Sequence, residues 1–133
     1  METIEKSNQV LAIIHRENDW QEGLSFLTPN DLFIQVGTWW YDKGKILDSH
    51  KHNEYERISM RTQEMVYVKE GSMRVLLFDE DNNNFLEDFV LKKGDLAIFA
   101  YGGHGYEILE DDTKIIESKN GPFTNVKKDK QKF

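Results

Sequence analysis

The chain has 133 residues, no cysteine and a formal net charge of −7. This length suits one domain with an ordinary core, and the lack of cysteine excludes disulfides, thiolate metal sites and a cysteine nucleophile. The negative charge argues against nucleic acid as the main partner, because phosphate binding requires a basic face. No apolar run approaches the roughly 20 residues of a membrane helix, and the charged N-terminus does not resemble a signal peptide. We therefore expect a cytoplasmic protein with no membrane partner.

The first thirty residues are expected to form an N-terminal arm. Val10–Ile14 (VLAII) is compatible with a strand or a helical turn, and Asn18–Gly23 with a loop or a single helical turn. Residues 31–123 are expected to form the body of the single domain. The basic tail, residues 124–133, is expected to be a solvated, frayed end.

From residue 33 onward, short segments rich in β-branched and aromatic residues alternate with glycine-containing or polar turns. This pattern predicts an all-β fold, either a sandwich or a barrel. The predicted strands are 33–41, 64–70, 73–79, 85–91, 95–100, 105–109 and 114–118.

Two of the four histidines, His50 and His52, stand two residues apart. In a strand, such residues point to the same side, and imidazole nitrogen is a common ligand of transition metals. A third and a fourth ligand must come from elsewhere, and the candidates are Glu54, Glu56, Glu64 and His104. The opposing interpretation is a pair of solvent-facing histidines without a ligand.

The segment that contains these histidines resembles the first signature motif of the cupin superfamily. That motif runs Gly, five residues, His-x-His, three or four residues, Glu, six residues, Gly. Gly44 is followed by five residues and His50, and Glu64 by six residues and Gly71. Eleven residues separate His52 from Glu64, which leaves Glu56 as a rival at the shorter family spacing. We favour Glu64, because strand parity places it on one face with Val66 and Val68.

The stretch GDLAIFAYGGHGYEI resembles the second cupin motif and supplies Gly94 and His104. It departs from that motif because Ala100 replaces the proline, Ile108 replaces the asparagine, and one residue is missing before the histidine. Further likeness, in VGTWWYDKGK, HKHN, RTQE and IIESKNGP, is to small single-domain cupins found among genes for surface polysaccharides and unusual sugars.

The resemblance implies a single double-stranded β-helix, the jelly-roll-like cupin barrel. It also implies that His50, His52, Glu64 and His104 hold one divalent transition metal, with iron, zinc, nickel and manganese all open. The implied ligand is a small polar molecule such as a sugar or nucleotide-sugar. Metal-dependent isomerisation, epimerisation or oxygenation, metal-free acid–base chemistry by histidine, and non-catalytic binding or sensing all remain open.

Arg57, Arg61 and Tyr101 are candidate substrate-binding residues. Guanidinium groups suit carboxylate and phosphate, although pairing of these arginines with surface carboxylates is the commoner role. Trp39, Trp40 and Tyr41 are consecutive and point to alternate faces of their predicted strand, so at least one is expected in the core. Another is expected to stack on a sugar or to pack in a homodimer interface.

Tyr106 shares the parity of His104, so it is a candidate catalytic acid or a core tyrosine. Glu117 and Lys119 are second-tier catalytic candidates. They are also compatible with an outward charge pair on an edge strand, which we favour. His15 is expected at the surface.

Overall fold

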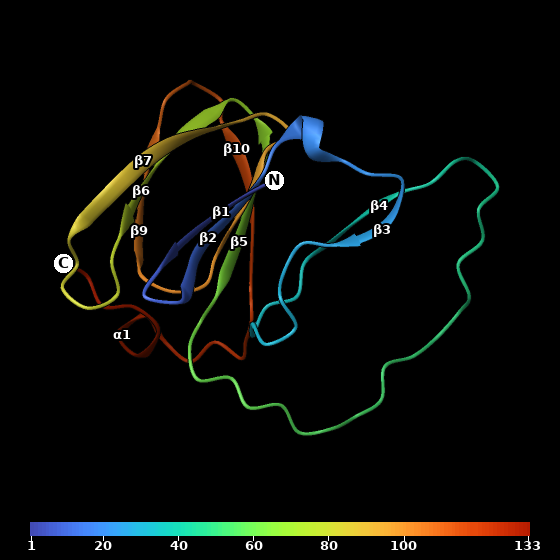
Figure 1. Cartoon of the computed structure of the whole chain (residues 1–133), viewed down its shortest axis with the longest axis horizontal. Coiled ribbons are helices and arrows are strands. Elements are labelled where there is room, and N and C mark those ends of the chain that lie inside the picture. The colour runs from blue at the N-terminus through green and yellow to red at the C-terminus, as the bar shows by residue number, and fades with distance from the viewer.

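The computed structural model describes residues 1–133, and its regular secondary structure is almost entirely antiparallel β-sheet (Figure 1). A five-stranded sheet has the order β1-β2-β8-β5-β10, and a three-stranded sheet the order β7-β6-β9. A separate two-stranded sheet pairs β3 with β4. The strands are β1 (Glu2–Lys6), β2 (Gln9–His15), β3 (Gly23–Phe26), β4 (Gly37–Trp40), β5 (Glu64–Glu70), β6 (Ser72–Phe78), β7 (Phe85–Lys92), β8 (Leu96–Phe99), β9 (Gly103–Ile108) and β10 (Lys114–Lys119).

The central strands of the five-stranded sheet are buried on both faces, whereas the edge strands β1 and β10 are largely exposed. One face packs against the three-stranded sheet through a cluster that includes Leu11, Val68 and Leu77. The other face is covered by the segment 27–36, whose apolar residues pack against Ile13 and Ile98. Double-sided burial explains why β2 and β8 are continuously apolar and do not alternate.

The predicted all-β class is confirmed. β5 has the predicted bounds, and five further strands lie within one or two residues of their predicted positions. Val10–Ile14 belongs to strand β2, and a 3₁₀ turn, η1 (Glu17–Asp19), follows it. The predicted strand 33–41 is shortened to β4, because the preceding residues cover the outer face of the large sheet without entering a ladder.

Residues 1–30 contribute two strands to the five-stranded sheet. β1 lies at its edge and β2 lies between β1 and β8. The expectation of a surface His15 is wrong: this residue is only 3% exposed, and its ring contacts Trp20 edge-on. The buried surface of β2 therefore continues to the end of the strand.

The expectation that at least one of Trp39, Trp40 and Tyr41 lies in the core is also wrong, because all three are exposed. Within β4 only Thr38 is buried. The β3–β4 hairpin projects away from the two packed sheets (Figure 1), so both of its faces meet solvent over part of their area. Alternation along β4 therefore does not separate a core face from a solvent face.

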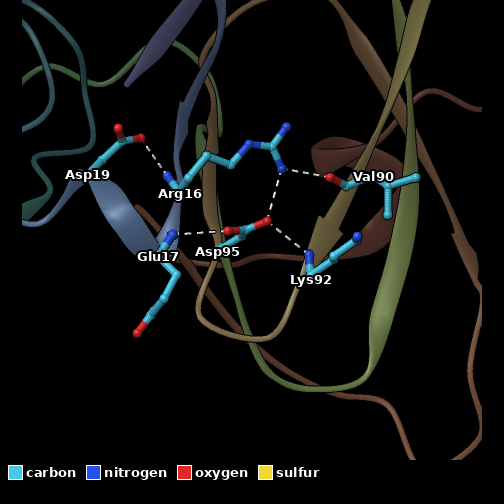
Figure 2. Close-up of polar contacts among 6 residues, drawn as sticks. All are labelled: Arg16, Glu17, Asp19, Val90, Lys92 and Asp95. Carbon is cyan, nitrogen blue, oxygen red and sulfur yellow. Dashed lines mark hydrogen bonds and ion pairs between the residues drawn. The ribbon is translucent and has the colours of Figure 1, made fainter.

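A buried carboxylate joins β2 to the turn between β7 and β8 (Figure 2). Asp95 accepts hydrogen bonds from Arg16 Nη1 at 2.9 Å, from the Glu17 amide at 3.1 Å and from the Lys92 amide at 3.0 Å. The same Arg16 nitrogen donates to the Val90 carbonyl. Both oxygens of Asp95 are thus satisfied by fixed groups, and the network anchors the sheet at this end.

The chain between β4 and β5 forms neither strand nor helix and swings away from the sheets before it returns to β5 (Figure 1). The C-terminal residues do not run free into solvent. They include the short helix α1 (Val126–Asp129), which lies near the beginning of β5 (Figure 1). None of the helices has the length and apolar character needed to cross a bilayer.

Candidate functional site

A cavity of about 800 Å³ opens at the end of the molecule where β5 begins and β8 ends. Its walls come from the end of the β4–β5 segment, the beginning of β5, the turns after β6 and β8, strand β9 and the C-terminal residues. Glu64, His104 and Tyr106 lie together on one wall. The sequence placed these three on two separate motifs, and the antiparallel fold brings them into contact.

Glu64 is the centre of this cluster. It is 4% exposed, and its Oε1 accepts a hydrogen bond from the Tyr106 hydroxyl at 2.6 Å. The same oxygen lies 3.3 Å from His104 Nε2. Two ionisable side chains of β9 therefore converge on one buried carboxylate oxygen of β5.

The environment keeps Glu64 ionised. Burial alone raises the pKa of this carboxyl, but the hydrogen bonds from His104 and Tyr106 outweigh that effect and lower it from 4.5 to about 2. Burial also raises the pKa of Tyr106, and the charge of Glu64 raises it further. At neutral pH the pair is therefore a carboxylate and a neutral phenol.

The ring of Phe99 supports the side chains of His104 and Tyr106 and fixes their orientation. This residue is 2% exposed, and its ring stacks on the His104 ring with centroids 4.5 Å apart. It also contacts Tyr106 edge-on at 5.9 Å, and it pairs with Glu64 across the β5–β8 ladder. The apolar support restricts the imidazole to the plane in which Nε2 faces the carboxylate.

Arg61 lies at the cavity wall in a fixed arrangement. Its two terminal nitrogens bond the two oxygens of Glu80, and its guanidinium lies 4.7 Å from the centroid of the Tyr101 ring. Glu80 also accepts from the Gly102 amide. Arg61 and Tyr101 therefore line the cavity as expected, with the Arg61 charge already paired.

The structure does not bring His50 and His52 to Glu64 and His104. Both lie in the exposed β4–β5 segment, with their ring centroids 5.2 Å apart, and neither lines the cavity. The rival ligand Glu56 is exposed in the same segment. No three histidine, aspartate or glutamate side chains gather closely enough to hold a metal ion, so this arrangement does not fit the implied four-ligand centre.

The remaining candidates from the sequence are Arg57, Glu117 and Lys119, of which only Arg57 lines the cavity. Arg57 lines the cavity and stacks over Tyr55, 4.1 Å from the ring centroid. Glu117 and Lys119 form a 2.9 Å ion pair with each other on the edge strand β10 and do not line the cavity. In the β5–β10 ladder Lys119 lies opposite Glu64 and Glu117 opposite Val66, so both side chains share the face of Glu64, and the outward orientation that we favoured is wrong.

Sequence reasoning missed the contribution of the C-terminal residues to the cavity. Asp129 accepts a hydrogen bond from Thr62, and the Phe133 ring lies 5.1 Å from that of Phe78. A side chain at Gly103 would meet the Phe133 ring at 2.6 Å, so this close approach depends on glycine. The Gly102–Gly103 pair is the signal in the sequence that could have indicated this close approach.

Searches of family models, curated proteins and solved structures found no match to this chain.

Proposed function

We propose that the protein is an enzyme that moves protons on a small polar molecule, with His104 as the acid–base group. The supporting observation is the buried, ionised Glu64 that holds His104 at the wall of a cavity large enough for a small molecule. A carboxylate on one imidazole nitrogen fixes the tautomer and stabilises the imidazolium that forms when the other nitrogen takes a proton.

The proposed chemistry is isomerisation or epimerisation next to a carbonyl. His104 Nδ1 takes a proton from substrate carbon, Glu64 Oε1 stabilises the resulting positive ring, and the proton returns to the same or a neighbouring atom. Phe99 restricts the ring plane during both transfers. Tyr106 donates its hydrogen bond to Glu64, so its proposed role is to position the carboxylate.

The fold class and the resemblance support a finer proposal. Two antiparallel sheets with a cavity at one end are compatible with a cupin barrel. The likeness to cupins of sugar pathways favours a sugar or nucleotide-sugar as substrate, and a cytoplasmic location accords with the absence of cysteine. Leu24, Phe26 and Trp39 are exposed on the β3–β4 hairpin, which favours a homodimer paired through this hairpin.

Deuterium exchange tests the acid–base proposal. A panel of sugar phosphates and nucleotide-sugars is incubated with the protein in D₂O, and mass spectrometry reports the gain of one deuteron. We expect exchange with at least one compound, the same exchange by His50→Ala, and loss of exchange in His104→Ala. Exchange that persists in His104→Ala, or no exchange with any compound, contradicts the proposal.

A metal-bound enzyme is the second candidate. Two of the four implied ligands, Glu64 and His104, are already adjacent, and the β4–β5 segment that carries His50 and His52 is not held in a sheet. Metal content of untagged protein, measured beside a His50→Ala/His52→Ala variant, tests it. One equivalent of iron, zinc, nickel or manganese that the variant loses supports the metal-bound form, and equal content in both proteins contradicts it.

A further inference from the structure

The C-terminal segment, defined here as residues 122–133, closes one side of the cavity. Pro122, Lys128, Lys130 and Phe133 are among its lining residues. The segment is held at two points: Asp129 bonds to Thr62, and Phe133 packs against Phe78 and Gly103. A tail held on both sides of a cavity presents its side chains to whatever the cavity binds.

The carboxylates that line the cavity already have donors. Glu64 is held by His104 and Tyr106, and Glu80 by Arg61 and the Gly102 amide. The other two lining carboxylates, Asp79 and Asp129, accept hydrogen bonds from Lys6, Asn82, Asn84 and Thr62.

Three of the cations that line the cavity have no ion-pair partner. Arg57 lies over an aromatic ring, and no carboxylate forms a salt bridge with Arg57, Lys128 or Lys130. Lys130 is near enough to the cluster to help lower the pKa of Glu64. These three cations are therefore free to pair with an anionic group of a ligand, although the chain as a whole is acidic.

One acceptor in the cavity wall has no donor. Asp129 Oδ2 is buried and makes no hydrogen bond, while the other oxygen of this carboxylate bonds to Thr62. A buried acceptor without a partner is costly, and a ligand hydroxyl satisfies it. Free cations beside a free acceptor match a ligand that carries both an anionic group and hydroxyls.

We infer that the C-terminal segment is the recognition element for a hydroxylated anion, with Lys128 and Lys130 contacting its phosphate or carboxylate and Asp129 accepting from a hydroxyl. This inference rests on the proposed function of the same cavity and names the substrate class for it. It assigns a specificity role to a segment that the sequence presents as a basic tail.

Binding of three probes tests the inference without turnover. Glucose 6-phosphate, gluconate and glucose are titrated into the full chain, and backbone amide chemical shifts are followed by NMR. We expect at least one of the two anions to shift the amides of residues 102–106 and 126–131, and the comparison between them distinguishes phosphate from carboxylate. Glucose is expected to produce no such shifts at the same concentrations.

The matched variants are Lys128→Ala/Lys130→Ala and Lys127→Ala/Lys132→Ala. Both remove two charges from the same segment, but only the first pair lines the cavity. We expect the first variant to raise the Kd of the better anion roughly tenfold or more, because charge-assisted contacts are lost. The second variant should change it by less than about twofold, since these exposed charges do not line the cavity and are screened by solvent.

Three results overturn the inference: equal losses in the two variants, binding of glucose as tight as that of the anions, or no binding by either anion. The proposed acid–base function is tested independently of these probes. It fails if His104→Ala still catalyses deuterium exchange, whether or not the anions bind. An Asp129→Asn variant that loses preference for glucose 6-phosphate over inorganic phosphate supports the hydroxyl contact, and an unchanged preference removes Asp129 from the recognition set.

Discussion

Two buried carboxylates belong to neighbouring strands of the same sheet, Glu64 at the beginning of β5 and Asp95 just before β8. They differ in the chemistry of the groups that donate hydrogen bonds to them. Asp95 is held by two backbone amides and Arg16, none of which changes its charge near neutral pH. Glu64 is held at the wall of a cavity by the Tyr106 hydroxyl and by His104, and imidazole is a side chain that exchanges protons near neutral pH. Burial alone therefore does not distinguish a structural carboxylate from a functional one, whereas the chemistry of the donors does.

The largest effect is expected at Asp95. Asp95→Ala leaves two backbone amides without an acceptor and removes the carboxylate partner of Arg16, and it is expected to lower the free energy of unfolding by about 3 to 5 kcal/mol. Urea denaturation provides the measurement. Asp88→Ala, which removes an exposed partner of Arg74, serves as the control and should cost less than about 1 kcal/mol. Similar losses in both variants contradict the structural assignment of Asp95.

The second-largest effect is expected on the pH dependence of the free energy of unfolding. Because folding lowers the pKa of Glu64 from 4.5 to about 2, its stabilising contribution is complete above pH 4.5 and is lost as the pH falls towards 2. The shift corresponds to about 3 kcal/mol. Denaturant unfolding across this range should show that this part of the acid dependence is absent in Glu64→Gln and present in Glu87→Gln, an exposed control. An unchanged acid dependence in Glu64→Gln shows that other groups produce it.

A smaller effect is expected from Tyr106→Phe. This variant removes one donor to Glu64 but retains the ring, so a loss of about 1 kcal/mol is expected. The pKa of Glu64 should rise from its lowered value, which NMR titration of the side-chain carboxyl carbon measures directly. A Glu64 pKa that stays at its wild-type value means that Tyr106 does not contribute to ionising the carboxylate.

The smallest effect is expected from His50→Ala/His52→Ala in protein freed of metal by chelation. Both rings are exposed, so the free energy of unfolding should change by less than about 0.5 kcal/mol. Thermal or urea unfolding of the two chelated proteins makes the comparison. A loss above 1 kcal/mol means that the β4–β5 segment packs on the body of the protein.

The strands were predictable wherever one buried strand follows another closely, as from β5 to β10, because β-branched runs and glycine-containing turns are local signals. β1 was missed because ETIEK carries charges, as befits an edge strand, and offers no apolar run. The tryptophans of β4 were misplaced because strand alternation tells which residues share a face. It does not tell whether that face meets a core.

Part of the site was predictable because its residues lie in regular strands. Glu64 and His104 came from motif spacing and Tyr106 from strand parity, both of which survive in a regular antiparallel ladder. The position of His50 and His52 was not predictable, since a long irregular segment carries no register. The donors to Asp95 were equally hidden, because Arg16 and Glu17 are distant in sequence and the turn KKGD offers no sign of them.

The pairing of β2 with β8 also affects how the molecule folds. Ile13 lies opposite Ile98, so a central ladder of the large sheet joins the beginning of the chain to its last third. Contacts between such distant residues slow folding, because a long loop must close before they form. During synthesis the apolar strand β2 leaves the ribosome early, and it cannot pair with β8 until most of the chain has been made. Newly made molecules should therefore depend on chaperones to shield this strand until β8 has emerged.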